Sequence, residues 1–339
     1  MPLPTLQQDS RREALKLALA ATLVAASALT LHSPVRADDS SAYPSKPIKL
    51  VVPYPPGGGT DALARVISAK LAESWKVPVV VENKTGASGM LGNDMVAKAP
   101  PDGYTVLVGI TALIQGPALF AKLPYDPTKD LVPLTAIARS ADLLLVPADF
   151  PANTLQEFVA LVKAHPKTYS IGNYGNGTSS HIHAAMLNSQ AKLDLNHVPY
   201  RGAGPLITDL LGGQVNSAFV DSSSIQPHLS SGKLKVLAVS GSRPSPLAPK
   251  APTLTSLGYH SFEPFGWFGL FLPAGTPPAI AKKLADEFTR VIKLPDVQER
   301  LQGMGLQPGG NPMDEFAREV KADKDVWAKV ITEAQIKLD

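Results

Sequence analysis

Two patterns of hydrophobic residues alternate along the chain. Short, continuous apolar runs predict buried β-strands, and apolar residues spaced three and four apart predict amphipathic helices. Strands that alternate with helices in this way are typical of an α/β protein with mostly parallel sheets. The predicted strands are residues 48–53, 77–81, 104–108, 143–146, 169–171, 215–220, 235–239 and 266–272.

Polar caps and prolines mark where several helices are expected to begin. Thr60 or Asp61 is placed to cap the first helix, and Thr154 is placed to cap a later one. Pro277 stands at the start of a helix near the C-terminus, and Asn311 with the proline after it precedes the last helix. No single Pro/Gly-rich linker divides the chain. This absence favours two domains that are joined by two crossings of the chain.

The first 37 residues have the pattern of an export signal. Arg11, Arg12 and Lys16 form a basic start, and an apolar run of about 15 residues follows it. This run is shorter than the roughly 20 residues that a membrane-spanning helix needs. We therefore predict a cleaved signal peptide over residues 1–37, exported by the general secretory or the twin-arginine route. A retained membrane anchor is the alternative.

Composition narrows the possible functions. The chain has 339 residues, enough for two domains, and 44% of them are hydrophobic, which excludes a disordered protein. It has no cysteine, so disulfides, thiol catalysis and cysteine-ligated metals are excluded. The net charge is +3, and the basic and acidic residues are scattered along the chain and do not cluster, which indicates no nucleic-acid partner. Removal of residues 1–37 would leave 302 residues with a net charge of +1.

Two glycine-rich loops follow predicted strands, at the place where open α/β sheets bind ligands. The first loop, residues 53–61, leads into a helix whose free N–H groups and positive dipole end favour an anion. The second loop, residues 172–181, places Thr178, Ser179 and Ser180 beside another helix start. One of these hydroxyls is expected to cap the helix, and three exceed what a cap requires. The two loops predict a carboxylate ligand held between two domains.

The same residues are also compatible with other functions. Gly57, Gly59 and Ala62 satisfy the G-x-G-x-x-A pattern of dinucleotide-binding dehydrogenases, and Glu82 ends the next strand. An export signal argues against such an enzyme, and an ordinary strand–helix turn would explain the loop as well. Asp221 ends a predicted strand, where it would either face a ligand or cap the helix that follows.

Catalytic and metal-binding patterns are weak in this sequence. It contains no G-x-S-x-G nucleophile elbow. His181 and His183 lie two residues apart, hence on different helix faces, and neither has an acidic neighbour in sequence. We expect packing, capping or surface roles for them, and we predict no catalytic residue, no metal and no cofactor. Trp267 and Phe268 are expected to be core residues of a strand between the domains.

A series of short motifs runs in order along residues 43–339. They are VPYPPGGGTD at 52–61, VVENK at 80–84, GASG at 86–89, PDGYT at 101–105, LPYDP at 123–127, GNGTSSH at 175–181, HVPYRG at 197–202, DLLGGQV at 209–215 and WFGL at 267–270. This series resembles the Bug family, the extracytoplasmic solute receptors of tripartite tricarboxylate transporters.

The resemblance implies a fold and a function. The fold is the type II periplasmic-binding-protein fold, with two α/β lobes joined by crossing strands and the ligand cleft between them. Residues 38–143 and 263–339 would form lobe 1, and residues 144–262 would form lobe 2. The function would be that of a monomeric, non-enzymatic periplasmic receptor, which delivers a small organic carboxylate to membrane permease subunits. A ligand sensor that feeds a two-component signalling system is an alternative.

The resemblance also implies which residues bind the ligand. Asp61 is expected to fix its loop as much as to contact the ligand. The run 219–224 departs from the family pattern, as do Asn216 and Ser217, so the identity of the carboxylate is not predicted. The implied ligand-binding residues are Tyr54, Gly58, Thr60 and Asp61 from the first loop, Thr178, Ser179 and Ser180 from the second, and Asp221.

Overall fold

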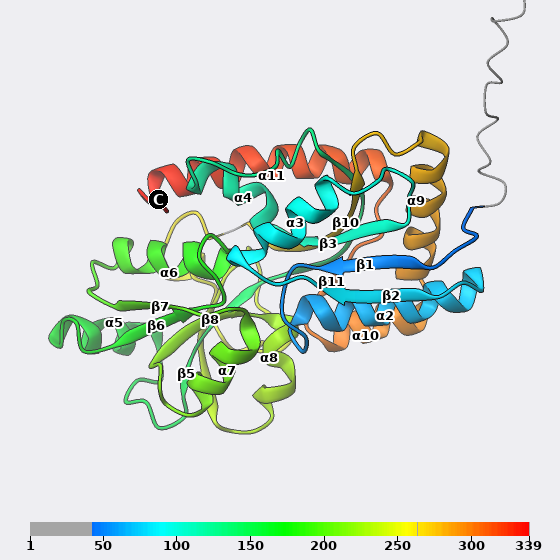
Figure 1. The fold of residues 1–339 in the computed structure, drawn as a ribbon. Helices are drawn as coiled ribbons and strands as arrows, with labels where there is room; N and C mark the ends of the chain where they lie inside the picture. Colours follow the sequence, from blue (N-terminus) through cyan, green and yellow to red (C-terminus); the bar gives the residue numbers. More distant parts are fainter. Residues whose placement is uncertain (1–42, 263, 339) are drawn as a thin grey trace, which may run out of the picture. The chain divides into compact units, whose positions relative to one another are not determined.

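Two β-sheets with helices packed around them make up the chain (Figure 1). The computed structural model describes residues 43–262 and 264–338. The predicted signal peptide, residues 1–37, lies outside the described residues. Among the helices of the described chain, none is long and apolar enough to span a bilayer.

The first sheet has six strands, in the order β11-β4-β10-β3-β1-β2. Its core strands are parallel: β1 pairs with β2 and with β3 in parallel register. β10 runs antiparallel between β3 and β4. The strands are β1 (Ile48–Val52), β2 (Val79–Asn83), β3 (Thr105–Ile110), β4 (Leu131–Ser140), β10 (Gly266–Pro273) and β11 (Gln307–Pro308).

The second sheet has five strands, in the order β7-β6-β8-β5-β9. β6 pairs in parallel with β7 and β8, and β5 runs antiparallel to β8 and β9. The second sheet therefore has one reversed strand, β5, whereas the first has two, because β11 also runs antiparallel to β4. The strands are β5 (Asp142–Pro147), β6 (Ser170–Asn173), β7 (Asn196–Pro199), β8 (Ser217–Asp221) and β9 (Leu234–Val239).

The chain crosses between the sheets twice. β4 of the first sheet leads directly into β5 of the second, with Ala141 between them, and the chain returns before β10. Because β5 and β10 each arrive from the other sheet, they lie antiparallel to their neighbours. The expectation of mostly parallel sheets is therefore wrong, and both sheets are mixed. An order with an antiparallel inner strand also differs from the parallel sheet of dinucleotide-binding enzymes.

Helices precede or follow most strands, as the alternating pattern predicts. α2, α3, α4, α9, α10 and α11 belong with the first sheet, and α5, α6, α7 and α8 with the second. Their bounds are α2 (Gly59–Trp75), α3 (Met90–Ala97), α4 (Ala112–Leu119), α5 (Leu155–Ala164), α6 (Ser179–Gln190), α7 (Ala203–Leu211), α8 (Ser222–Leu229), α9 (Pro278–Ile292), α10 (Pro295–Gly303) and α11 (Met313–Glu333).

The predicted helix caps are partly right. Thr154 caps α5, because its side chain accepts a hydrogen bond from the Glu157 N–H at 3.1 Å. The expectation that Thr60 or Asp61 caps α2 is wrong, because the helix already begins at Gly59 and Gly58 is its N-cap. The last helix begins after Pro312 without a side-chain cap. Gly58 has no side chain that could accept from the first N–H groups of α2.

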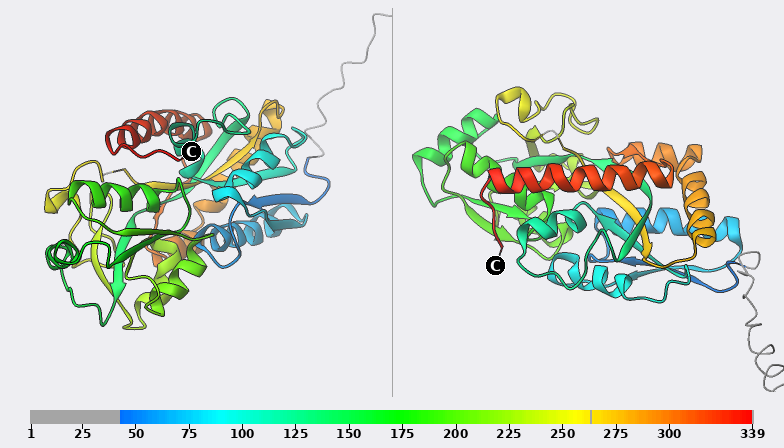
Figure 2. Two further views of the ribbon diagram at one scale, coloured as in Figure 1. Left: turned by 60° about the vertical axis from the view of Figure 1, so that its left-hand side comes forward. Right: turned by 90° about the horizontal axis from the view of Figure 1, so that it is seen from above.

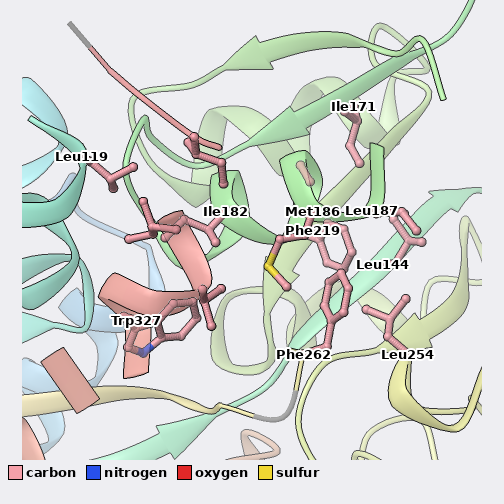
Figure 3. Close-up of a cluster of buried hydrophobic side chains, with 14 of the residues drawn as sticks. Leu119, Leu144, Ile171, Ile182, Met186, Leu187, Phe219, Leu254, Phe262 and Trp327 are labelled. Carbon is pink, nitrogen blue, oxygen red and sulfur yellow. The ribbon is translucent and has the colours of Figure 1, made fainter. Parts of the chain in front are cut away.

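α11 connects the helices of both sheets (Figures 1 and 2). It packs on β4 and α4 of the first sheet, and its Trp327 ring lies 5.8 Å from the ring of His183 on α6. Trp327 is fully buried in a hydrophobic cluster that includes residues of α6, β5, β6 and β8 (Figure 3). One hydrophobic core therefore extends over elements of both sheets.

Candidate functional site

A pocket opens where loops of the two sheets face each other. It holds about 610 Å³ of space not occupied by atoms, part of which is open to solvent. The lining residues are Tyr54, Pro55, Gly58, Gly59, Thr60, Ile110, Thr111, Ser140, Asp142, Tyr174, Ser179, Gly202, Ala203, Gly204, Asp221, Ser224, Gly266, Trp267 and Phe268.

The first glycine-rich loop brings the start of α2 to the pocket. Tyr54, Gly58 and Thr60 line the pocket, as does Gly59 between them. The Gly59 N–H donates a hydrogen bond to Ser224 Oγ of α8 at 2.9 Å, so this loop is tied to the second sheet. Burial raises the pKa of Tyr54, whose hydroxyl donates to the Ser88 carbonyl at 3.3 Å.

Asp61 holds the loop from behind and is not among the lining residues. Its carboxylate accepts hydrogen bonds from the Gly57 N–H at 3.1 Å, from Arg65 Nε at 2.9 Å and from Asn83 Nδ2 at 3.0 Å. Burial by itself would raise the pKa of Asp61, but these three donors together hold that pKa below its usual range. The ionised carboxylate thus fixes the shape of the loop.

The three hydroxyls of the second loop point in different directions. Ser179 lines the pocket, and its Oγ accepts a hydrogen bond from Gln115 Nε2 of α4 at 3.1 Å. Thr178 Oγ1 donates to the Gly175 carbonyl at 2.6 Å, and Ser180 Oγ donates to the Phe219 carbonyl at 2.6 Å. Thr178 is the N-cap of α6 but makes no side-chain capping bond. The expectation that one hydroxyl caps α6 is wrong, because two of them stabilise other backbone carbonyls.

Asp221 both caps a helix and faces the pocket. It is the N-cap of α8, where its Oδ1 accepts from the Ser224 N–H at 3.0 Å and from Ser223 Oγ at 2.5 Å. Burial raises the pKa of Asp221, and the neighbouring carboxylate of Asp142 raises it further against the hydrogen bonds of the two serines. The two roles that the sequence left open for this residue therefore coexist.

Several lining residues were not predicted from the sequence. Asp142 begins β5 and lies directly opposite Asp221 of β8 in the antiparallel register. Tyr174 donates a hydrogen bond to Asp142 Oδ1 at 3.2 Å. A polar residue at the start of the apolar run 143–146 is a signal that could have identified Asp142, since strand ends carry the ligand in such sheets. Trp267 and Phe268 are buried as expected, and they also line the pocket.

His183 has an acidic partner that its neighbours in sequence do not reveal. Its Nδ1 lies 2.9 Å from Asp142 Oδ2, and its ring is buried.

Burial, with a smaller contribution from His197, lowers the pKa of His181 to about 4. Within residues 43–262 and 264–338, no group of three or more His, Cys, Asp and Glu residues is arranged to hold a metal ion.

Two sheets linked by two crossing segments, with a pocket between their loops, define a two-lobed periplasmic binding protein. Known structures of this class are similar over most of the chain. The periplasmic binding protein BugD has a TM-score of 0.83 and 32% sequence identity, covering 87% of this chain and 100% of BugD. MatC from Rhodopseudomonas palustris with bound malate has a TM-score of 0.80 and 34% identity, covering 85% of this chain and 100% of MatC.

The chain belongs to the tripartite tricarboxylate transporter family of receptors, whose sequence profile matches residues 63–336. The protein BugT of Bordetella pertussis is 33% identical to it over 310 residues, which cover 91% of this chain and 94% of BugT. The predicted family and the predicted periplasmic-binding-protein fold are thereby confirmed. The members of this family are periplasmic solute receptors.

Proposed function

We propose that this protein captures a small organic carboxylate in the pocket and delivers it to the membrane permease subunits of a tripartite tricarboxylate transporter. The observation that carries the proposal is the convergence of helix starts on the pocket. Gly59 of α2, Ser179 of α6 and Ala203 of α7 are the first residues of their helices, and all three line it. Helix starts present N–H groups that have no acceptor within the helix, and positive dipole ends, both of which favour an anion. The Gly59 N–H itself donates to Ser224 Oγ, so in α2 the N–H groups that follow it and the dipole would serve the anion.

These helix starts would take the place of a cationic side chain as the partners of the carboxylate. In the described part of the chain, the pocket lining includes no lysine, arginine or histidine. α2 belongs with the first sheet, whereas α6 and α7 belong with the second. A bound carboxylate would therefore accept hydrogen bonds from both lobes and favour their closure around it.

The remaining parts of the proposal follow from the family. Residues 1–37 would be a signal peptide removed on export to the periplasm, by the general secretory or the twin-arginine route. The mature protein would act as a monomer and catalyse no reaction. Lobe 1 would comprise residues 38–143 and 263–339, and lobe 2 residues 144–262. The malate bound to MatC supports a carboxylate as the class of ligand.

Binding measurements on the mature protein test this proposal. Native mass spectrometry would identify any small molecule that co-purifies, and a thermal-shift panel of carboxylates would then be measured, because a ligand that binds the folded state raises the Tm. Isothermal titration calorimetry would give the Kd of the best ligand. A panel in which no carboxylate raises the Tm, with none co-purifying, would refute the proposal.

Ser179→Ala tests the location of the site. The Ser179 hydroxyl lines the pocket, so its loss is expected to weaken the best carboxylate by about three- to tenfold, the equivalent of one hydrogen bond. Ser189→Ala is the matched control, because Ser189 is an exposed serine on the same helix, α6. Equal Kd values for Ser179→Ala and the wild type would contradict this location.

A further inference from the structure

Asp142 is a buried carboxylate on the pocket wall that has no lysine or arginine beside it in the described chain. It is 4% exposed and lines the pocket. Its side-chain contacts in the described chain are with Tyr174 and His183, not with lysine or arginine. Burying a charge is costly unless it is paired, so a carboxylate in this position calls for a positive partner from outside the chain.

Two donors hold the Asp142 carboxylate in place. The Tyr174 hydroxyl lies 3.2 Å from Oδ1, and burial, followed by the charge of Asp142, raises the pKa of Tyr174 well above its usual value. The tyrosine therefore remains a neutral donor. His183 Nδ1 lies 2.9 Å from Oδ2 on the other side. These contacts orient the carboxylate toward the pocket.

Apart from Asp142, the groups around the His183 ring are apolar. Its Nε2 is buried and has no hydrogen-bond partner among the described residues. Its ring lies 5.5–5.8 Å from the rings of Phe219, Phe262 and Trp327. A second N–H at Nε2 would be left unpaired against these apolar neighbours. The hydrogen bond of His183 within the described chain is therefore the one between Nδ1 and Asp142.

Asp221 adds a second carboxyl group to the same wall. Asp142 and Asp221 are direct partners in the β5–β8 pair, and opposite residues of antiparallel strands have Cα atoms about 4.5–5.5 Å apart. The hydrogen bonds to Asp221 from Ser223 Oγ and from the Ser224 N–H both fall on Oδ1. A negative group of a ligand would be repelled by this wall, whereas a positive N–H donor would be attracted.

We propose that the ligand carries a protonated amine in addition to its carboxylate, and that Asp142 with the Tyr174 hydroxyl binds the ammonium group. The inference rests on the proposed function, in which the helix starts bind the carboxylate. Asp142 and the Tyr174 hydroxyl would bind one end of the ligand, and the helix starts would bind the other. The class of ligand is an amino-carboxylic acid, bound in one orientation.

Matched sets of ligands test this inference on the wild-type protein. Each set keeps one carbon skeleton and changes a single group from amine to hydroxyl to hydrogen: alanine, lactate and propionate; aspartate, malate and succinate; 4-aminobutyrate, 4-hydroxybutyrate and butyrate. In the set that binds best, calorimetry is expected to show the amine at least about tenfold tighter than both analogues, the equivalent of one charged hydrogen bond. Equal or tighter binding of the analogues overturns the inference and leaves the carboxylate receptor standing. Failure of every carboxylate to bind overturns both.

Asp142→Asn locates the ammonium site. The variant is expected to lose about tenfold or more in affinity for the amine and to change little toward its deaminated analogue. Asp149→Asn is the matched control, because Asp149 is exposed shortly after the same strand. Circular dichroism checks the fold, and Tyr174→Phe, which keeps the carboxylate, replaces the variant if Asp142→Asn does not fold. An equal loss for the amine and its analogue would overturn the assignment.

Discussion

Gly59 lies where two helix starts from different sheets meet. A Cβ atom at this position would lie 2.0 Å from Ser223 Oγ and 2.9 Å from Asp221 Oδ1. The Gly59 N–H also donates to Ser224 Oγ, so the backbones of α2 and α8 are held close together. Space, rather than an unusual backbone angle, requires glycine here. The residue therefore determines how closely the two halves of the pocket approach.

Gly59→Ala is expected to separate these two helix starts. Because the Cβ has no space, the donors of α2 would shift relative to α6 and α7, and the best ligand would bind at least about tenfold more weakly. Calorimetry measures the affinity, and small-angle X-ray scattering measures whether the ligand still compacts the protein. Gly303→Ala is the control, since a Cβ there meets nothing within 4 Å. An unchanged Kd in Gly59→Ala would contradict this role.

At the scale of elements, α11 supports the pocket through β10. Trp267 of β10 lines the pocket, and its Nε1 donates a hydrogen bond to Asp323 Oδ2 of α11 at 3.1 Å. Arg139 of β4 pairs with Glu319 one turn earlier on the same helix. Burial, and then the charge of Glu319, raises the pKa of Asp323 to about 6. The helix thus carries a carboxyl group that the fold prefers protonated.

Asp323→Asn is expected to change how stability depends on pH. The folded-state pKa of about 6 exceeds the usual Asp value of about 3.9. Protonated Asp323 therefore contributes fully to the free energy of unfolding below pH ~4, and this contribution is lost as the pH rises through 6. Asparagine keeps the acceptor for Trp267 and cannot ionise. Allowing for solvent screening, the variant should be about 1–2 kcal/mol more stable than wild type at pH 7.5 and equal at pH 4.

Urea denaturation at both pH values checks this expectation. Asp325→Asn serves as the control, because Asp325 is an exposed residue of the same helix. A difference between Asp323→Asn and wild type that is the same at pH 4 and pH 7.5 would show that ionisation of Asp323 is not its cause.

At the scale of the whole molecule, the two lobes share a hydrophobic core away from the pocket. The cluster in Figure 3 joins Trp327 of α11 to Ile182 and Met186 of α6 and to Phe219 of β8. The cluster couples the folding of the two sheets, because unfolding either sheet would expose the apolar side chains that the other sheet contributes to it.

Trp327→Ala is expected to destabilise the whole protein. Removing a fully buried tryptophan costs about 3–5 kcal/mol of unfolding free energy, because a cavity remains between α11 and α6. Denaturant unfolding, followed by circular dichroism and by fluorescence of the remaining tryptophans, measures the change. Val326→Ala is the control, since Val326 is 43% exposed. A loss below about 1 kcal/mol for Trp327→Ala would show that the cluster does not join the lobes energetically.

The sequence alone determined the features that depend on neighbouring residues. Apolar runs and helical spacing identified the α/β class and most strands, and the glycine-rich loops identified two helix starts that line the pocket. β4 was not predicted as a strand, because Pro133, Thr135 and Arg139 interrupt its apolar run. Motifs in a fixed order over nearly the whole chain were sufficient to identify the family.

Only the tertiary structure decided the features that depend on residues far apart in the chain. The crossing of β5 and β10 made both sheets mixed, and the packing of α6 against β8 turned Ser180 away from the pocket while Ser179 faced it. Asp142 and His183 meet across 41 residues of sequence. A local pattern cannot specify such contacts, because they are set by which strands pair and in what register. The sequence could therefore predict that the two loops and Asp221 come to the pocket, whereas Asp142 and its contact with His183 could be found only in the tertiary structure.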